Sequence, residues 1–173
     1  VLLLLTSAFG AVYLTSQPTS LTSKASGDCD PDMIQITNQT DQSADLFFLT
    51  STDCQSSVVL GSKNYSNLRA ASPAESQTIH YFRLDGLSPS TNYTYSIISG
   101  GKKYQLSNFN FQTRSTTNNN LPDSILAWGK ILTPDRIPAF GAVIFINIPG
   151  AAPISAMSNS EGLWNIPLSS TYD

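Results

Sequence analysis

From Asp30 onward the chain alternates short apolar runs with clusters of Gly, Pro, Ser, Thr and Asn. Short apolar runs bounded by turn residues are typical of all-β proteins. In the run that begins at Ala44, apolar side chains at every second position place Ala44, Leu46 and Phe48 on one face of a strand. The same alternation predicts which side chains of the other runs face the core. The core predicted from these runs consists of Leu46, Phe48, Val58, Tyr95, Phe109 and Phe111.

The pattern predicts about seven strands between residues 30 and 114, the size of one β-sandwich domain. Ile79, Tyr81 and Leu84 are expected to alternate toward the core in one of them, and Gly100 and Gly101 to form a hairpin turn. The predicted strands cover residues 33–38, 44–51, 57–61, 77–84, 93–97 and 104–113, with a short edge strand within 62–76.

Residues 115–123, rich in Thr, Asn and Ser, are predicted to be a linker. Four further strands are predicted at 125–132, 140–147, 154–157 and 163–166. These runs predict a second β-region after the linker.

The first 14 residues form a continuous apolar run. This run is shorter than the ~20 residues of a membrane-spanning helix and has the length of a signal peptide. Since no initiator Met or basic segment precedes it, we expect a chain truncated upstream, with an apolar helix that is a cleaved signal or a membrane anchor. A buried core helix is the alternative. The polar residues 15–29 are predicted to be a flexible tether.

A turn in the middle of the chain carries four residues at alternate positions, Leu87, Pro89, Thr91 and Tyr93. In β-sandwiches, a tyrosine just after such a corner bonds through its hydroxyl to the backbone a few residues upstream. The four residues resemble the E–F corner of fibronectin type III domains. The resemblance implies an immunoglobulin-like β-sandwich over residues 30–114, used as a scaffold or recognition module, with Phe48 where these domains usually carry Trp.

Three short motifs follow the predicted linker, and each contains a glycine: Gly129-Lys130-Ile131, Gly141-Ala142-x-Ile144 and Gly162-x-Trp164-x-Ile166. They resemble carboxypeptidase-regulatory-like domains, and this resemblance implies a second, partial β-sandwich over residues 124–173. Such domains usually have about seven strands, so we expect the chain to continue past Asp173. The whole arrangement is similar to modular bacterial surface proteins. A second resemblance implies another role. His80, Leu84, Gly86 and Leu87 are similar to a motif in the N-terminal domain of purple acid phosphatases, which would make this chain an accessory part of a larger extracellular hydrolase.

The chain contains two cysteines, Cys29 and Cys54. An even count in an exported chain favours a disulfide bond. If residues 33–38 and 44–51 form a hairpin centred between Asp41 and Gln42, residues whose numbers sum to 83 face each other, and 29 and 54 satisfy this sum. Closing a loop of this size would contribute roughly 3 kcal/mol. Two reduced thiols are the alternative, and two cysteines without nearby histidines do not indicate a metal site.

Composition adds limits on the chemistry. Charged residues are only 12% of the chain, the net charge is −3, and Lys and Arg do not cluster, so no nucleic-acid partner is expected. His80 is the only histidine, which favours a structural or strand-surface role over charge-relay catalysis. Asp28, Asp30 and Asp32 lie at alternate positions, as in a calcium loop, but the mid-loop Gly and closing Glu are missing. We therefore expect a solvated acidic segment, and no metal or cofactor.

Three N-glycosylation sequons begin at Asn38, Asn64 and Asn92, of which Asn64 is the best acceptor in a secreted eukaryotic chain. The aromatic residues are interpreted as core, with a sugar-stacking platform as the alternative. The function predicted is that of a non-catalytic exported protein, extracellular or on the cell surface, secreted or attached to the membrane through residues 1–14. It would act as a spacer or adhesion scaffold for an unidentified protein or glycan ligand. A carbohydrate-binding module and the hydrolase accessory remain open.

Overall fold

The computed structural model describes residues 28–72, 75–116 and 125–168. These ranges contain twelve β-strands and no α-helix, which confirms the all-β class for the described part of the chain. The predicted apolar helix at residues 1–14, the tether up to residue 27 and most of the predicted linker lie outside the described residues. Within the described ranges, no helix has the length and apolar character needed to cross a membrane.

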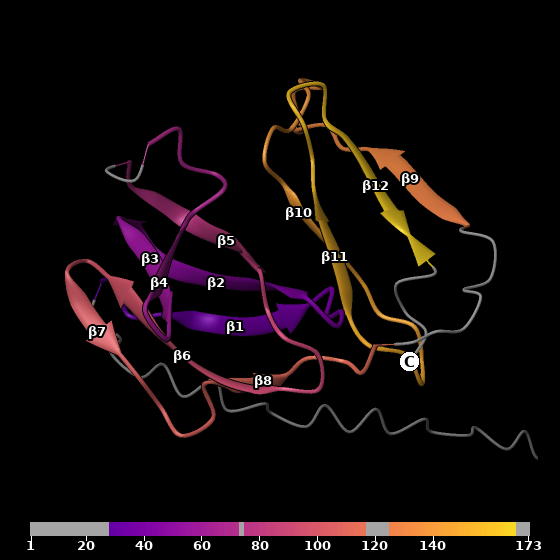
Figure 1. Cartoon of the computed structure of the whole chain (residues 1–173). Coiled ribbons are helices and arrows are strands. Elements are labelled where there is room, and N and C mark those ends of the chain that lie inside the picture. Colours follow the sequence, from indigo (N-terminus) through magenta and orange to yellow (C-terminus); the bar gives the residue numbers. More distant parts are fainter. Residues whose placement is uncertain (1–27, 73–74, 117–124, 169–173) are drawn as a thin grey trace, which may run out of the picture.

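Residues 28–116, here called the first region, form two antiparallel sheets (Figure 1). One sheet has the order β1-β2-β5, and the other has the order β4-β3-β6-β7 with β8 also paired to β6. The strands of the three-stranded sheet are β1 (Asp32–Thr37), β2 (Ser43–Cys54) and β5 (Gln77–Asp85). Those of the five-stranded sheet are β3 (Ser56–Leu60), β4 (Lys63–Ser66), β6 (Asn92–Ser99), β7 (Lys102–Tyr104) and β8 (Asn110–Gln112).

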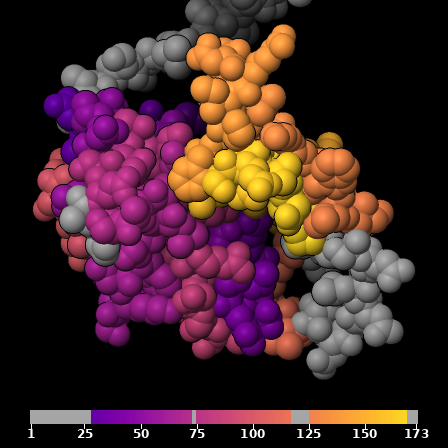
Figure 2. Space-filling model, turned by 90° about the horizontal axis from the view of Figure 1, so that it is seen from above, coloured from indigo at the N-terminus to yellow at the C-terminus, as the bar shows by residue number. Residues whose placement is uncertain are grey.

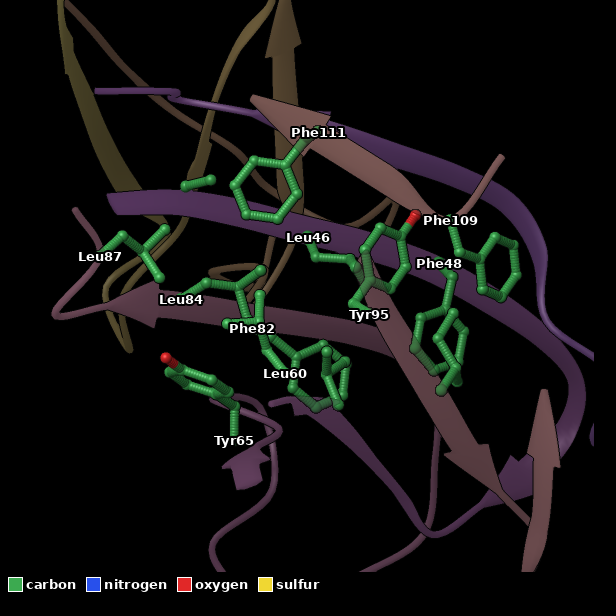
Figure 3. Close-up of a cluster of buried hydrophobic side chains, with 13 residues drawn as sticks. Leu46, Phe48, Leu60, Tyr65, Phe82, Leu84, Leu87, Tyr95, Phe109 and Phe111 are labelled. Carbon is green, nitrogen blue, oxygen red and sulfur yellow. The ribbon is translucent and has the colours of Figure 1, made fainter. Parts of the chain in front are cut away.

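Apolar side chains from both sheets meet in one buried cluster (Figure 3). All six residues predicted as core belong to it. Phe48 and Phe82 stack within the three-stranded sheet, with ring centroids 5.7 Å apart, and neither ring is exposed. Full burial of a side chain of this size contributes roughly 1.5–3 kcal/mol. The cluster is therefore the main source of stability in the first region, and it joins the two sheets.

The predicted strand at 104–113 is interrupted. Both β7 and β8 pair with β6, but the residues between them leave the ladder in a turn, where the Phe109 N–H donates to the carbonyl of Leu106 at 3.0 Å. Phe109 returns to the ladder, since its carbonyl accepts from the N–H of Tyr95 at 3.0 Å, and the two rings lie 5.1 Å apart. Phe109 and Phe111 share the core face, as residues two apart in a strand do.

The alternation predicted for β5 is wrong at Ile79 and Tyr81, whereas Leu84 lies in the core as predicted. Tyr81 does not face the core, which instead receives the preceding and following residues, His80 and Phe82. In the β2–β5 ladder Phe48 lies opposite His80 and Leu46 lies opposite Phe82, and directly opposite residues share a face. Tyr81 therefore lies on the outer face of the three-stranded sheet.

The register predicted for the first hairpin is also wrong. Thr37 pairs with Asp45 and Ile36 with Leu46, so paired residue numbers sum to 82, and a β-bulge changes the sum before Asp32 pairs with Leu49. The Thr40 N–H donates to the carbonyl of Ser43 at 2.8 Å, so the turn itself is centred between Asp41 and Gln42 as predicted, and the register shifts by one residue between this turn and Thr37. The two cysteines meet although the ladder does not place them opposite each other.

Residues 125–168, here called the second region, form two two-stranded antiparallel sheets. One contains β10 (Val143–Ile146) and β11 (Ile154–Met157), and the other contains β9 (Leu126–Lys130) and β12 (Leu163–Pro167). In Figure 1, β10 and β11 lie between the first region and the β9–β12 pair. Figure 2 shows the second region, orange to yellow, against the indigo and magenta strands of the first.

Candidate functional site

The densest group of polar side chains lies where the second region contacts the outer face of the β1-β2-β5 sheet. Thr37, Asp45 and Ser155 are buried there, and Asn38 and Tyr81 complete the group. Asp45 and Tyr81 reach this face because they alternate with core residues along β2 and β5. Four of the five residues come from the first region, and Ser155 comes from β11 of the second.

Asp45 is the charged centre of this group. Its carboxylate accepts hydrogen bonds from the Tyr81 hydroxyl at 2.7 Å, from Asn38 Nδ2 at 2.5 Å and from Arg83 Nη1 at 3.0 Å. Only 5% of the Asp45 side chain is exposed. A buried carboxylate is tolerated where ionic and neutral donors satisfy its oxygens, as they do here. Burial, and next the charge of Asp45, raise the pKa of Tyr81, so its hydroxyl stays protonated and donates to Asp45.

Asn38 holds the backbone of β11 through its side-chain amide. Its Oδ1 accepts from the N–H of Ser155 at 2.9 Å, and its Nδ2 donates to the carbonyl of Ser155 at 2.8 Å. The N–H of Asn38 also donates to the carbonyl of Pro153 at 3.1 Å. The Ser155 hydroxyl lies 2.6 Å from that of Thr37 and 2.9 Å from that of Tyr81. We call Thr37, Asn38, Asp45 and Tyr81 the Asn38 socket, and Pro153–Ser155 its occupant.

Two further contacts join the regions beside the socket. The rings of Phe47 and Phe145 meet edge to face, with centroids 5.0 Å apart. The guanidinium of Arg69 lies against Gly141, where a Cβ would come within 2.8 Å of Cζ. The Nε and Nη1 atoms of Arg69 are buried and have no hydrogen-bond partner among the described residues, and burial lowers the pKa of this guanidinium. The contact thus combines the hydrogen-bonded carboxylate of Asp45 with a guanidinium that has two buried nitrogens without a partner among the described residues.

His80 lies inside the first region rather than at a surface. Its ring stacks on Phe48 at 4.4 Å, Nε2 lies 2.9 Å from the hydroxyl of Thr50, and Nδ1 lies 2.5 Å from that of Ser56. Burial and then the charge of Arg69 lower the pKa of His80 to about 4. A catalytic serine–histidine pair needs a carboxylate on the second ring nitrogen and access to substrate. This ring has a threonine there and is fully buried, so the geometry is that of a neutral structural histidine.

The four corner residues lie close together as the motif predicts. The hydroxyl of Tyr93 accepts from the N–H of Ser88 at 2.8 Å, five residues upstream. The Thr91 hydroxyl donates to the carbonyl of Pro89 at 2.8 Å, and Leu87 is buried. The N–H of Thr91 donates to the hydroxyl of Thr113, a partner that the sequence did not reveal. The corner therefore anchors the start of β6 to β8.

Replacing Tyr93 by Phe tests the corner. The change removes one hydrogen bond to the backbone and keeps the ring, so we expect the free energy of unfolding to fall by about 1 kcal/mol. Urea denaturation followed by circular dichroism measures the difference. Tyr104→Phe, which removes a hydroxyl that donates to Asp30, is the matched control outside the corner. An equal loss in both variants would contradict a special role for the corner.

The sulfurs of Cys29 and Cys54 lie 2.00 Å apart, as the predicted disulfide requires. The bond packs on the β6–β7 turn, where a Cβ at Gly100 would lie 2.6 Å from Sγ of Cys29. Gly100 has a φ of 56° and its N–H donates to the carbonyl of Gln55 at 3.0 Å. Only glycine satisfies both the positive φ and this close approach. The disulfide thus holds the segment before β1 against the five-stranded sheet of the first region.

The other candidate ligands do not converge. Asp30 accepts from the hydroxyl of Tyr104 at 2.5 Å, and Asp32 accepts from the N–H of Met33. Within the described residues, no group of three or more His, Cys, Asp or Glu could hold a metal ion. The aromatic residues considered for sugar stacking are mostly buried, including Tyr81, whose hydroxyl faces the socket. Within the described ranges, Trp128 and Phe140 of the second region are exposed aromatic side chains.

The sequons differ in their surroundings. Asn64 and Asn92 are exposed, on β4 and at the start of β6. Asn38 uses its side-chain amide in the socket, so a glycan on Nδ2 would displace the contact with Ser155. Sequence reasoning did not single out Asp45, Ser155 or the role of Asn38 in the socket. The sequence did contain one signal of a covered outer face. Asp45 is a carboxylate within the apolar run of β2, and Phe47 is a large apolar residue on the same outer face.

Comparison of the chain with protein-family models, with curated proteins and with solved structures found no match, so the argument for function depends on the residues and contacts described above.

Proposed function

We propose that the chain is a non-catalytic exported surface protein whose first region is a fibronectin type III-like module acting as a spacer or as an adhesion and binding scaffold. The strand orders β1-β2-β5 and β4-β3-β6-β7 support an immunoglobulin-like sandwich, and so does the buried cluster shared by the two sheets. The hydrogen bond of the corner Tyr93 to Ser88 adds to this support. The second region is proposed to be part of a carboxypeptidase-regulatory-like sandwich.

Export is supported by the chemistry of the chain. A disulfide between Cys29 and Cys54 persists in oxidising compartments outside the cytosol. Few charged residues and many Ser, Thr and Asn fit the same setting. The apolar residues 1–14 are the proposed membrane partner, as a signal or an anchor. The ligand would be a protein or a glycan.

A spacer role rests on one observation, the Asn38 socket. Several buried hydrogen bonds and a ring contact hold the second region at a fixed position relative to the first. A linker alone would leave that position variable. The resulting unit would have a fixed length, which is what a protein that displays a binding surface needs. His80, with both ring nitrogens bonded to hydroxyls in the core, supports a role without catalysis.

Replacing Asn38 by Ala tests the fixed contact. The change removes the amide that bonds both backbone groups of Ser155, so we expect docking of the second region to weaken by about 2 kcal/mol. Small-angle X-ray scattering should then give a larger radius of gyration than the wild-type protein. Asn64→Ala, at an exposed amide on β4, is the control and should leave the radius unchanged.

An unchanged radius in Asn38→Ala would contradict the fixed spacer. The non-catalytic proposal has a separate test. The purified chain should turn over none of a panel of phosphoester, glycoside and peptide substrates. A turnover that His80→Ala abolishes would overturn it.

A further inference from the structure

The Asn38 socket recognises its occupant mainly through the backbone. Three of the hydrogen bonds to Pro153–Ser155 use only carbonyl and N–H groups of that segment. The socket also binds the side-chain hydroxyl of Ser155, which lies between the hydroxyls of Thr37 and Tyr81. The occupant that fits is therefore an extended segment with a serine. This chain itself carries such a segment, in β11.

The socket and its occupant are separate parts of the chain. Every group of the socket lies between residues 37 and 81, and the occupant lies at residues 153–155, with residues 117–124 connecting the two regions outside the described ranges. When two copies exchange identical elements, each native contact is kept. The free energy changes only because the contact joins two chains instead of two parts of one chain, which alters the entropic cost of bringing them together. A second copy of the chain offers the same occupant with the same hydrogen bonds.

Arg69 makes the contact easier to open than its hydrogen bonds suggest. Its Nε and Nη1 atoms are buried without partners among the described residues, and Nη1 lies against Gly141 of the second region. Buried donors without partners oppose the arrangement that buries them. Undocking returns this guanidinium to water, and undocking is the step that an exchange between copies requires.

We propose that a second copy of this chain can occupy the Asn38 socket, so that copies exchange their second regions. A short connection gives the chain's own segment an effective concentration in the mM range, so dilute protein is monomeric. Copies held at comparable local density on a surface would exchange and form dimers or open chains. This inference rests on the docked contact and not on export or the absence of catalysis.

Two variants that are defective on opposite sides of the contact test the exchange. Asn38→Ala damages the socket and keeps the occupant, whereas Ser155→Leu damages the occupant and keeps the socket. Each variant alone should be monomeric. Mixed at about 100 μM each, the occupant of the first should enter the socket of the second, because neither competes in cis. For a contact favoured about 100-fold in cis, the dissociation constant would be about 10 μM. Light scattering coupled to size exclusion should show a 1:1 heterodimer only in the mixture.

The matched control mixes Asn64→Ala with Ser155→Leu. The occupant of Asn64→Ala is already held in cis, so this mixture should stay monomeric. Adding Arg69→Met to the Ser155→Leu variant removes the buried guanidinium and should raise the fraction of heterodimer with Asn38→Ala. Should either variant lose its β-sheet circular dichroism, Phe47→Ala and Phe145→Ala provide an equivalent pair on the same two sides. No heterodimer at about 1 mM would overturn the exchange. The scattering test of Asn38→Ala and the substrate panel would stand regardless.

Discussion

Replacing Cys29 and Cys54 by Ser is expected to lower the free energy of unfolding by about 3 kcal/mol. The disulfide joins residues separated by 25 positions, and in the chain-entropy treatment the gain comes from restricting the unfolded chain. The reduced protein also loses the packing of Cys29 on the β6–β7 turn at Gly100, so the segment before β1 would separate from the five-stranded sheet. Urea denaturation of the double variant and of the wild-type protein, followed by circular dichroism, measures the difference.

Reduction of the wild-type protein with a thiol reagent is the matched experiment, because it breaks the same bond without changing the sequence. The double variant and the reduced protein should unfold at the same urea concentration, and the reagent should not affect the double variant. A loss below about 1 kcal/mol would mean that the bond does not constrain this fold. A shift caused by the reagent in the double variant would show an effect other than disulfide reduction.

The second large effect is a loss of stability in mild acid. The pKa of His80 is about 4 in the folded protein, against an ordinary value near 6.5, because burial and the charge of Arg69 disfavour the imidazolium. Between these values the unfolded chain binds the proton more readily than the folded one. Stability contributed by the neutral ring is therefore fully present above pH 6.5 and declines as the pH falls toward 4. The difference corresponds to about 3 kcal/mol.

The measurement is a series of urea denaturations between pH 7 and pH 4. His80 is the only histidine, so most of the slope between pH 6.5 and 5 should belong to it. His80→Gln keeps a polar group beside Ser56 and Thr50 but does not titrate, so its stability should be lower at pH 7 and nearly constant over that range. An equal slope in both proteins would show that His80 is not the group responsible.

Much of the first region could be predicted from local pattern. The alternation in Ala44–Leu49 placed Leu46 and Phe48 in the core because a strand with one covered face needs that period. The corner at Tyr93 was predictable because its spacing is fixed by local backbone geometry. The interruption before β8 was not, since the turn closed by the bond from the Phe109 N–H to the Leu106 carbonyl leaves no mark in the alternation of apolar residues. The register of the first hairpin failed because the ladder shifts by one residue between the turn and Thr37 and again before Asp32, and strand periodicity reveals neither shift.

The Asn38 socket could not be predicted from strand periodicity. Tyr81 was expected in the core because it alternates with Ile79 along the strand, and alternation alone does not tell which of the two faces is covered by the core. Only the pairing of Phe48 with His80 shows which face Tyr81 occupies. Ser155 is one serine among many, and its role follows from its position opposite Asn38, 117 residues away in the chain. A polar cluster buried between two regions is barely visible in the sequence. Here its one sign is the charged residue Asp45 within an apolar run.

The proposed spacer and the proposed exchange both require the second region to cover the outer face of the β1-β2-β5 sheet. The most direct test is a nuclear Overhauser spectrum of dilute protein with carbon-13-labelled phenylalanine. The rings of Phe47 and Phe145, whose centroids are 5.0 Å apart, should give a cross-peak that the Asn38→Ala variant weakens. Absence of that cross-peak in folded wild-type protein, with the cross-peak between Phe48 and Phe82 still present, would contradict the account.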